Sequence, residues 1–189
     1  MLFRSQIPPK PVVDAYYSGF APEISAFLSL AGVGWHIDTG VHCLRLILGG
    51  VFDRFPALQI IVGHNFEILS WSAWRMDYSF PPNHNGGLKR TIKEYLRENF
   101  YGGILAGEYV GQEPGAMDSS WSLAYHAYLG MTNTVGIDRV VFTKDYPYGD
   151  MKAARQFFDQ MPINVNEKEK IAHLNAERLL GLGRQRAAE

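Results

Sequence analysis

Predicted strands and helices alternate along this chain, and that alternation constrains its fold more than any other feature. Two short runs rich in β-branched residues, 58–62 and 139–143, are typical of strands buried on both faces. Residues 100–105 form a third, glycine-containing candidate, and residues 2–3 resemble the end of another strand. Such alternation is characteristic of right-handed βαβ units. We therefore predict a parallel sheet, either open or rolled into a barrel.

Helices are predicted where apolar side chains recur at helical spacing. In residues 35–49, apolar side chains recur every three or four positions and the segment ends at a glycine pair. Thr91 and Glu94 match a capping box, which predicts a helix over residues 92–98. The remaining expectations are a long loop at 106–118 and helices at 67–78, around 121–128, at 151–160, and at 166–180 with Asn166 and Glu169 as its cap.

Composition excludes several classes of function. The net charge of -1, the pI near 6.6 and the lack of a Lys/Arg cluster argue against a nucleic-acid partner. Cys43 is the one cysteine, so neither an internal disulfide nor a cysteine-based metal site is expected. No signal-like start is present, and apolar runs fall well short of the roughly 18 residues of a membrane span. We therefore expect a single cytoplasmic domain over residues 1–189 with no membrane partner.

His64 and Asp145 are the strongest candidates for chemistry, because each directly follows a predicted buried strand. In parallel α/β folds the active site lies beyond the carboxyl ends of the strands. An imidazole and a carboxylate there suit a divalent metal or a general acid/base pair. The alternative is structural, with His64 capping the next helix and Asp145 holding the turn that follows it. His36 and His42, both on the helix at 35–49, are predicted to be structural.

Four separate segments carry a family resemblance. In order along the chain they are LRLI…GVFDRFP (44–56), GHNFE (63–67), DRVVF…DYPY (138–148) and NAERLL (175–180). Together they resemble the amidohydrolase-related family, close to metal-dependent non-oxidative decarboxylases of the resorcylate and aminocarboxymuconate-semialdehyde type. Their order and spacing hold almost from end to end, so the resemblance is specific.

The resemblance implies that residues 1–189 are one partial domain, about strands 5–8 of a metal-dependent (β/α)₈ barrel. In such a barrel one divalent metal, often zinc, is held by a Glu-x-His or His-x-His pair on the first strand. A histidine after the fifth strand and an aspartate after the eighth complete the site. His64 corresponds to the histidine after the sixth strand, which contacts metal or substrate, and Asp145 to the final aspartate. Glu67 corresponds to the acid that orients this histidine. Arg75 matches an arginine that pairs with a substrate carboxylate, although a solvated helix charge explains it equally well.

The implied activity is that of a carboxy-lyase that releases CO₂ from an aromatic or unsaturated carboxylic acid. Asp145 would deliver a proton to the ring carbon, while His64 would hold metal or substrate. A metal-dependent hydrolase would use the same residues with a metal-bound water as nucleophile. The sequence does not separate these two activities.

Departures from the family pattern leave a third alternative open. Arg4 stands where the fifth-strand histidine is expected, and the first-strand pair is absent, so His64 and Asp145 are the ligands that remain. We therefore expect a divalent metal, zinc or manganese, to bind weakly or not at all. Asn65 and Phe66 also replace a glycine-containing pair. The chain would then be an inactive half-barrel that associates with a partner, and exposed strand edges favour a homo-oligomer.

Overall fold

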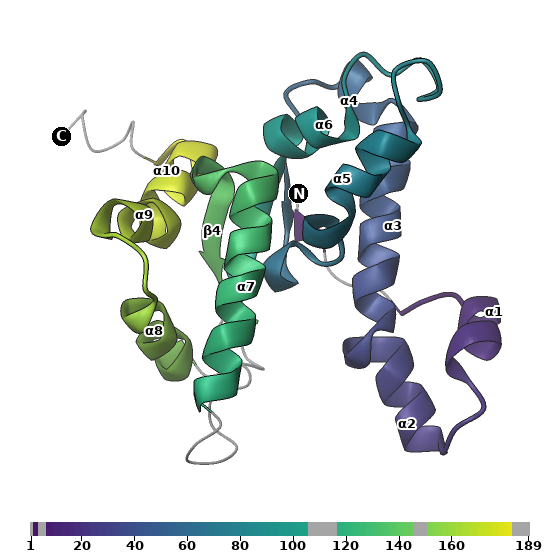
Figure 1. The fold of residues 1–189 in the computed structure, drawn as a ribbon, viewed down its shortest axis with the longest axis horizontal. Helices are drawn as coiled ribbons and strands as arrows, with labels where there is room; N and C mark the ends of the chain where they lie inside the picture. Colours follow the sequence, from purple (N-terminus) through teal and green to yellow (C-terminus); the bar gives the residue numbers. More distant parts are fainter. Residues whose placement is uncertain (1, 4–6, 106–116, 146–150, 183–189) are drawn as a thin grey trace.

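Four parallel strands form one sheet in the computed structural model, which describes residues 2–3, 7–105, 117–145 and 151–182 (Figure 1). The strands lie side by side in chain order: β1 (Leu2–Phe3), β2 (Ile60–Val62), β3 (Phe100–Leu105) and β4 (Val140–Thr143). Gly102 on β3 lies opposite Val62 on one side and Val140 on the other. The predicted parallel sheet is confirmed. Its regular order, in which each strand is added beside the last, is consistent with part of a barrel.

Helices and helical turns connect these strands. Before β2 come α1 (Lys10–Val12), η1 (Val13–Tyr17), α2 (Pro22–Phe27), η2 (Leu28–Gly32), α3 (Gly34–Leu48) and α4 (Val51–Arg54). Between β2 and β4 lie η3 (His64–Phe66), α5 (Leu69–Ser79), α6 (Ile92–Asn99), α7 (Met117–Val135) and η4 (Ile137–Arg139). After β4 come α8 (Met151–Gln160), α9 (Val165–Glu169), η5 (Lys170–Leu174) and α10 (Asn175–Leu180). Within the described residues, no helix is both long and apolar enough to cross a membrane.

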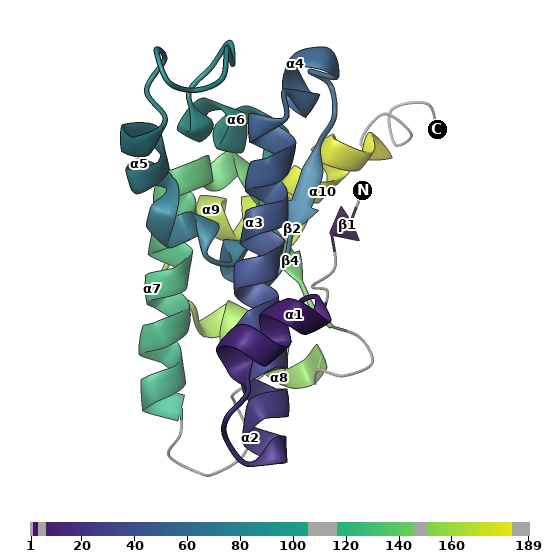
Figure 2. The same cartoon turned by 90° about the vertical axis from the view of Figure 1, so that its right-hand side faces the viewer.

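Helices flank the two ends of the sheet (Figure 1). α3 runs along one side of the molecule and α8 to α10 lie on the other, with α7 close to β4 (Figure 1). A quarter turn shows α3 passing in front of β2 and α2 continuing beyond it (Figure 2). A glycine permits one close approach here, because a Cβ at Gly40 in α3 would meet the Ile68 side chain at 2.3 Å. α3 is therefore held against the segment that follows β2.

Two boundaries differ from the sequence expectation. α7 begins at Met117, so the end of the predicted loop is helical, and residues 106–116 lie outside the described part. The predicted cap at Asn166 and Glu169 is wrong. Asn164 caps α9 instead, because its backbone is extended and its side chain accepts a hydrogen bond from the Glu167 N–H at 2.9 Å.

An aromatic cluster joins α4, α6, β3 and η3. The Phe100 ring lies 5.0 Å from that of Phe52 and 6.4 Å from that of Phe66, while Tyr95 packs on Phe52 at 6.3 Å. All four side chains have no solvent exposure. Because Phe66 belongs to the turn that carries His64, the core fixes the position of this turn.

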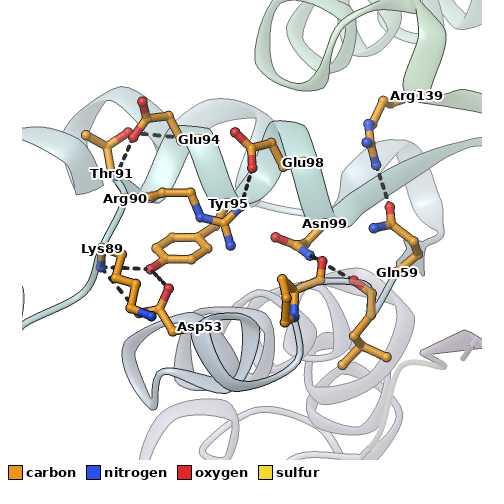
Figure 3. A network of polar contacts seen from close by, with 12 residues as sticks. Asp53, Gln59, Lys89, Arg90, Thr91, Glu94, Tyr95, Glu98, Asn99 and Arg139 are labelled. Carbon is orange, nitrogen blue, oxygen red and sulfur yellow. Dashed lines mark hydrogen bonds and ion pairs between the residues drawn. The ribbon is translucent and has the colours of Figure 1, made fainter.

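A polar network surrounds Tyr95 at the entrance to α6 (Figure 3). Its hydroxyl donates to Asp53 Oδ1 at 2.6 Å and accepts from the Lys89 N–H at 3.2 Å. The predicted capping box is confirmed: Glu94 N–H donates to Thr91 Oγ1, and Thr91 N–H donates to Glu94 Oε2. The start of α6 is therefore fixed by side chains as well as by packing.

Asn99, at the end of α6, fixes the segment that leads into β2. Its buried amide donates to the carbonyls of Pro56 and Leu58, each at 2.9 Å (Figure 3). We expect Asn99→Ala to lower the free energy of unfolding by about 2 kcal/mol, because the fully buried amide loses two hydrogen bonds to backbone carbonyls. Urea titration measures the change, and Asn133→Ala, at an exposed position of α7, is the control expected to stay within about 0.5 kcal/mol of wild type. Equal stabilities of the two variants would contradict this role.

Candidate active site at the strand ends

His64 and Asp145 meet at the carboxyl end of the sheet although β3 separates their strands. His64 begins η3, two residues after β2, and Asp145 follows β4 by two residues. His64 Nε2 lies 3.2 Å from Asp145 Oδ2. The His64 side chain is 23% exposed and that of Asp145 41% exposed, so both are open to a small molecule. The structure thus brings together the two residues at which sequence analysis placed the chemistry.

Glu67 lies between two histidines. Its Oε1 is 2.9 Å from His64 Nδ1, and its Oε2 makes a short hydrogen bond with His36 Nδ1. The two imidazole rings are 5.5 Å apart and almost perpendicular. The Glu67 side chain is only 1% exposed, so its charge is compensated by the two rings rather than by water. This contact is the one that the resemblance implies between Glu67 and His64.

His36 is the site residue that sequence analysis missed. We predicted a structural helix residue, whereas the first turn of α3 places its ring against Glu67. His36 is 31 positions before Glu67 in sequence, and the contact depends on the close packing of α3 on the segment after β2. Gly40 in the middle of a predicted helix was the one sequence signal for such packing.

The turn that carries His64 and Glu67 has a strained backbone. His64, Asn65, Phe66 and Glu67 all have positive φ values, between 46° and 71°, and none is glycine. Residues other than glycine rarely adopt positive φ values, and those that do are concentrated at functional sites. This turn contains Asn65 and Phe66, which replace the glycine-containing pair expected from the resemblance. The fully buried Phe66 side chain holds the turn in place.

Charges in this cluster are set by its hydrogen bonds. The hydrogen bond to Glu67 raises the pKa of His36 against the opposing effect of burial. Burial would raise the pKa of Glu67, but the hydrogen bonds to His36 and His64 outweigh it and lower that pKa overall. Nearby, burial raises the pKa of Cys43 to about 12. Cys43 is therefore a neutral thiol near pH 7 and a poor nucleophile.

Arg75 has a different environment. It is exposed on α5, and its guanidinium lies 5.4 Å from the Trp74 ring and 5.9 Å from the Tyr78 ring. Both contacts are on its own helix, and the pairing of Arg75 with a substrate carboxylate stays a prediction. Arg4, which stands where a ligand histidine was expected, lies outside the described residues. Lys144, the residue before Asp145, has a buried ammonium group.

Three donors of metal-ligand type converge in this cluster. His36, His64 and Glu67 each offer one ligand atom, and these atoms all lie within 4.8 Å of one another. An imidazole and carboxylate cluster beyond the carboxyl ends of parallel strands is the arrangement of active sites in α/β barrel enzymes. The fold and the cluster therefore define an α/β protein with an enzyme-like site at its strand ends.

The chain belongs to the amidohydrolase family, whose model matches residues 12–182. A gamma-resorcylate decarboxylase from Polaromonas is 32% identical over 162 residues, which are 82% of this chain and 44% of that protein. The chain thus spans less than half the length of this curated relative. The resemblance seen in the sequence is confirmed.

Solved structures of similar fold include two decarboxylases. A dihydroxybenzoic acid decarboxylase from Polaromonas, with bound manganese and the inhibitor 2-nitroresorcinol, has a TM-score of 0.77 and 27% identity. The match covers 96% of this chain and 49% of the decarboxylase chain. A 2,6-dihydroxybenzoate decarboxylase from Rhizobium has a TM-score of 0.75 and 26% identity, with 96% and 51% coverage. The present fold therefore matches about half of these larger structures.

Proposed function

We propose that this chain is a carboxy-lyase that releases CO₂ from an aromatic carboxylic acid of the hydroxybenzoate class. The observation that carries the proposal is the pairing of His64 Nε2 with Asp145 Oδ2 at the strand ends, 3.2 Å apart, in a member of the amidohydrolase family. Similarity to decarboxylases of dihydroxybenzoates supports the choice of substrate class. This similarity also favours a lyase over a hydrolase.

Asp145 is the proton donor in this proposal. Its Oδ2 faces His64, which leaves Oδ1 to carry the proton toward substrate. The proton adds to the ring carbon that bears the carboxylate, the C–C bond then breaks, and its electron pair returns to the ring as CO₂ leaves. Solvent reaches the partly exposed Asp145 carboxylate and returns the proton. His64 holds Asp145 in position and contacts the substrate.

A divalent metal is part of the expectation, and when bound it would neutralise the substrate carboxylate and accept electron density. Of the ligand positions that the resemblance implies, His64 and Asp145 are described, and they lie within hydrogen-bond distance of each other. Catalytic zinc sites use three protein ligands, so this pair by itself does not fit a resident metal. The proton transfer above is therefore assigned to Asp145 without a step through a metal.

Several broader expectations stay predictions. These are a single domain over residues 1–189, a homo-oligomer and a cytoplasmic location. Within the described residues, β1 and β4 are the two edge strands of the sheet, and each pairs with one other strand. Edge strands can pair with a second chain, which supports self-association.

Product analysis tests the proposed activity. The full chain is incubated with 2,6-dihydroxybenzoate and added Mn²⁺ or Zn²⁺, and resorcinol and CO₂ are quantified. We expect equal amounts of both products. Asp145→Asn keeps the shape but loses the acidic proton, so its rate should fall by about 10²–10⁴-fold. The control is Asp159→Asn, which changes an exposed carboxylate paired with Arg155 on α8. No resorcinol from wild type, or equal rates for wild type and Asp145→Asn, would refute the proposal.

A further inference from the structure

Residues 7–33 form a helical arm that extends beyond the sheet. In both views α2 lies past the end of α3, away from the strands (Figure 1, Figure 2). Among the described residues, the arm packs mainly on itself and on α3. It carries three charged residues, and two of them, Lys10 and Asp14, pair with each other. The arm is therefore a nearly uncharged element at the edge of the molecule.

Large apolar side chains on this arm are exposed. The side chains of Tyr16, Phe20 and Phe27 are 58–77% exposed, and that of Ile24 is 54% exposed. Because an aromatic side chain presents about 150–250 Å², these three rings together leave roughly 400 Å² of apolar surface in water. Monomeric proteins rarely expose more than a few hundred Å² in one apolar patch, and larger patches mark interaction sites. The arm therefore has the surface of an interface.

The arm also contains an apolar recess of about 370 Å³. Its walls are formed by Glu23, Ile24, Phe27, Leu28, Gly32 and Val33. An apolar cavity of about 150 Å³ is enough to bind benzene, so this recess has room for an aromatic ring. Phe20, four residues before Ile24, is exposed and is not one of the walls. An exposed ring and a recess of suitable size on the same arm make the arm complementary to itself.

The composition of the arm favours a second copy of this chain as the partner. Homodimer interfaces are more apolar than other protein interfaces, and their centres are depleted of charged residues. In a two-fold dimer both copies use the same surface, so the ring and the recess would each be used twice. With Ile24 and Val33 included, two arms would bury roughly 1,000 Å², which reaches the smallest area of a specific interface.

One wall of the recess leads to the candidate active site. η2 contributes Leu28 and Gly32 to the recess, and between them the Ala31 carbonyl lies 3.0 Å from His36 Nε2. A carbonyl can only accept, so His36 donates this hydrogen bond. Within η2, Leu30 has φ -101° and ψ -118°, which are not helical values. Packing against this irregular segment therefore affects the position of the His36 ring.

We propose that two copies of this chain pair through their arms about a two-fold axis, with Phe20 of each copy in the recess of the other. This packing holds η2 in place and, through the Ala31 carbonyl, supports His36 beside Glu67. It assigns the expected homo-oligomer to a surface that is separate from the edge strands β1 and β4. The pairing does not depend on decarboxylation, and its test needs no substrate.

Sedimentation velocity of the full chain over a range of concentrations tests the pairing. We expect a wild-type dimer, and a dissociation constant at least about 30-fold weaker for Phe27→Asp, the effect of losing a central interface residue. Circular dichroism checks that this variant folds. Phe55→Asp is the matched control, because Phe55 is 61% exposed, directly follows α4 and lies outside the arm. It should dimerise like wild type. A monomeric wild type, or equal dissociation constants for wild type and Phe27→Asp, would overturn the proposal.

Hydrogen exchange of wild type gives a second readout that requires no variant. The amides of α2 and η2 should exchange more slowly at concentrations where the dimer forms than after dilution. Protection confined to β1 and β4 would assign the association to the strand edges and overturn the pairing of the arms. The imidazole ¹⁵N resonances of His36 should also shift on dilution, and unchanged resonances would contradict the support of His36 by the paired arms.

Discussion

Replacement of Tyr95 by alanine is expected to lower the free energy of unfolding by about 3–5 kcal/mol, the usual cost of deleting a buried aromatic ring. Tyr95 has no solvent exposure and packs on Phe52 at the junction of α4 and α6. Its loss leaves a cavity in the cluster that supports β3 and the His64 turn. Urea unfolding followed by circular dichroism measures the change.

Tyr95→Phe separates the ring from its hydroxyl. This variant keeps the packing and loses the hydrogen bond to Asp53, so we expect a cost of about 1 kcal/mol. The cost stays small because the Lys89 N–H, which also bonds to Tyr95, keeps a second acceptor in Asp53 Oδ2. Tyr78→Ala, at a 75% exposed position on α5, is the control and should stay near wild type. A cost for Tyr95→Ala no larger than that for Tyr78→Ala would contradict the core role.

Local signals in the sequence predicted most of the fold. The β-branched runs, the periodic segment at 35–49 and the capping box at Thr91 each depend on residues a few positions apart, and each is confirmed. The cap of α9 shows where local signals are ambiguous. Asn164 and Asn166 are each followed three residues later by a glutamate, and only the backbone of Asn164 is extended. The sequence offers both caps, and the tertiary path of the chain selects one.

The residues of the candidate site show the same contrast between local sequence signals and tertiary packing. His64 and Asp145 could be predicted because their positions at strand ends are a local property and parallel strands bring such ends together. Glu67 was implied by the family resemblance of residues 63–67, and its contact with His64 spans only three positions. His36 could not be predicted, since its contact with Glu67 spans 31 positions and depends on how α3 packs. A helix pattern identifies the face that is buried but not the partner that it meets.

Glu67→Ala is expected to lower the free energy of unfolding by about 3 kcal/mol in metal-free buffer. Removing one partner from a buried charged pair costs about 3–5 kcal/mol, because the charge left behind loses its compensation. We expect a cost at the lower end of this range, because the imidazoles of His36 and His64 are 27% and 23% exposed and can be hydrated when the carboxylate is removed. Urea unfolding measures the change.

The variant Glu67→Gly separates two contributions to stability, that of the carboxylate and that of the backbone strain at position 67. Glu67 has φ 53° and ψ -143°, a conformation that glycine adopts far more easily than other residues. Glu67→Gly should therefore be more stable than Glu67→Ala by about 1 kcal/mol, the reverse of the usual order. Glu98, exposed on α6, is the matched control at a helical position. There the glycine variant should be the less stable of the two by about 1 kcal/mol.

The stability gap between wild type and Glu67→Ala should also depend on pH. The pKa of Glu67 is lowered in the folded chain, so its contribution is present above the unfolded value of 4.5 and is lost as pH falls through the folded pKa. The pKa of His36 is raised, so its contribution is complete below 6.5 and is lost as pH rises through the folded pKa. The gap should therefore be widest between pH 4.5 and 6.5. A gap that does not change with pH would mean that the cavity, and not the charge between two imidazoles, accounts for the loss of stability.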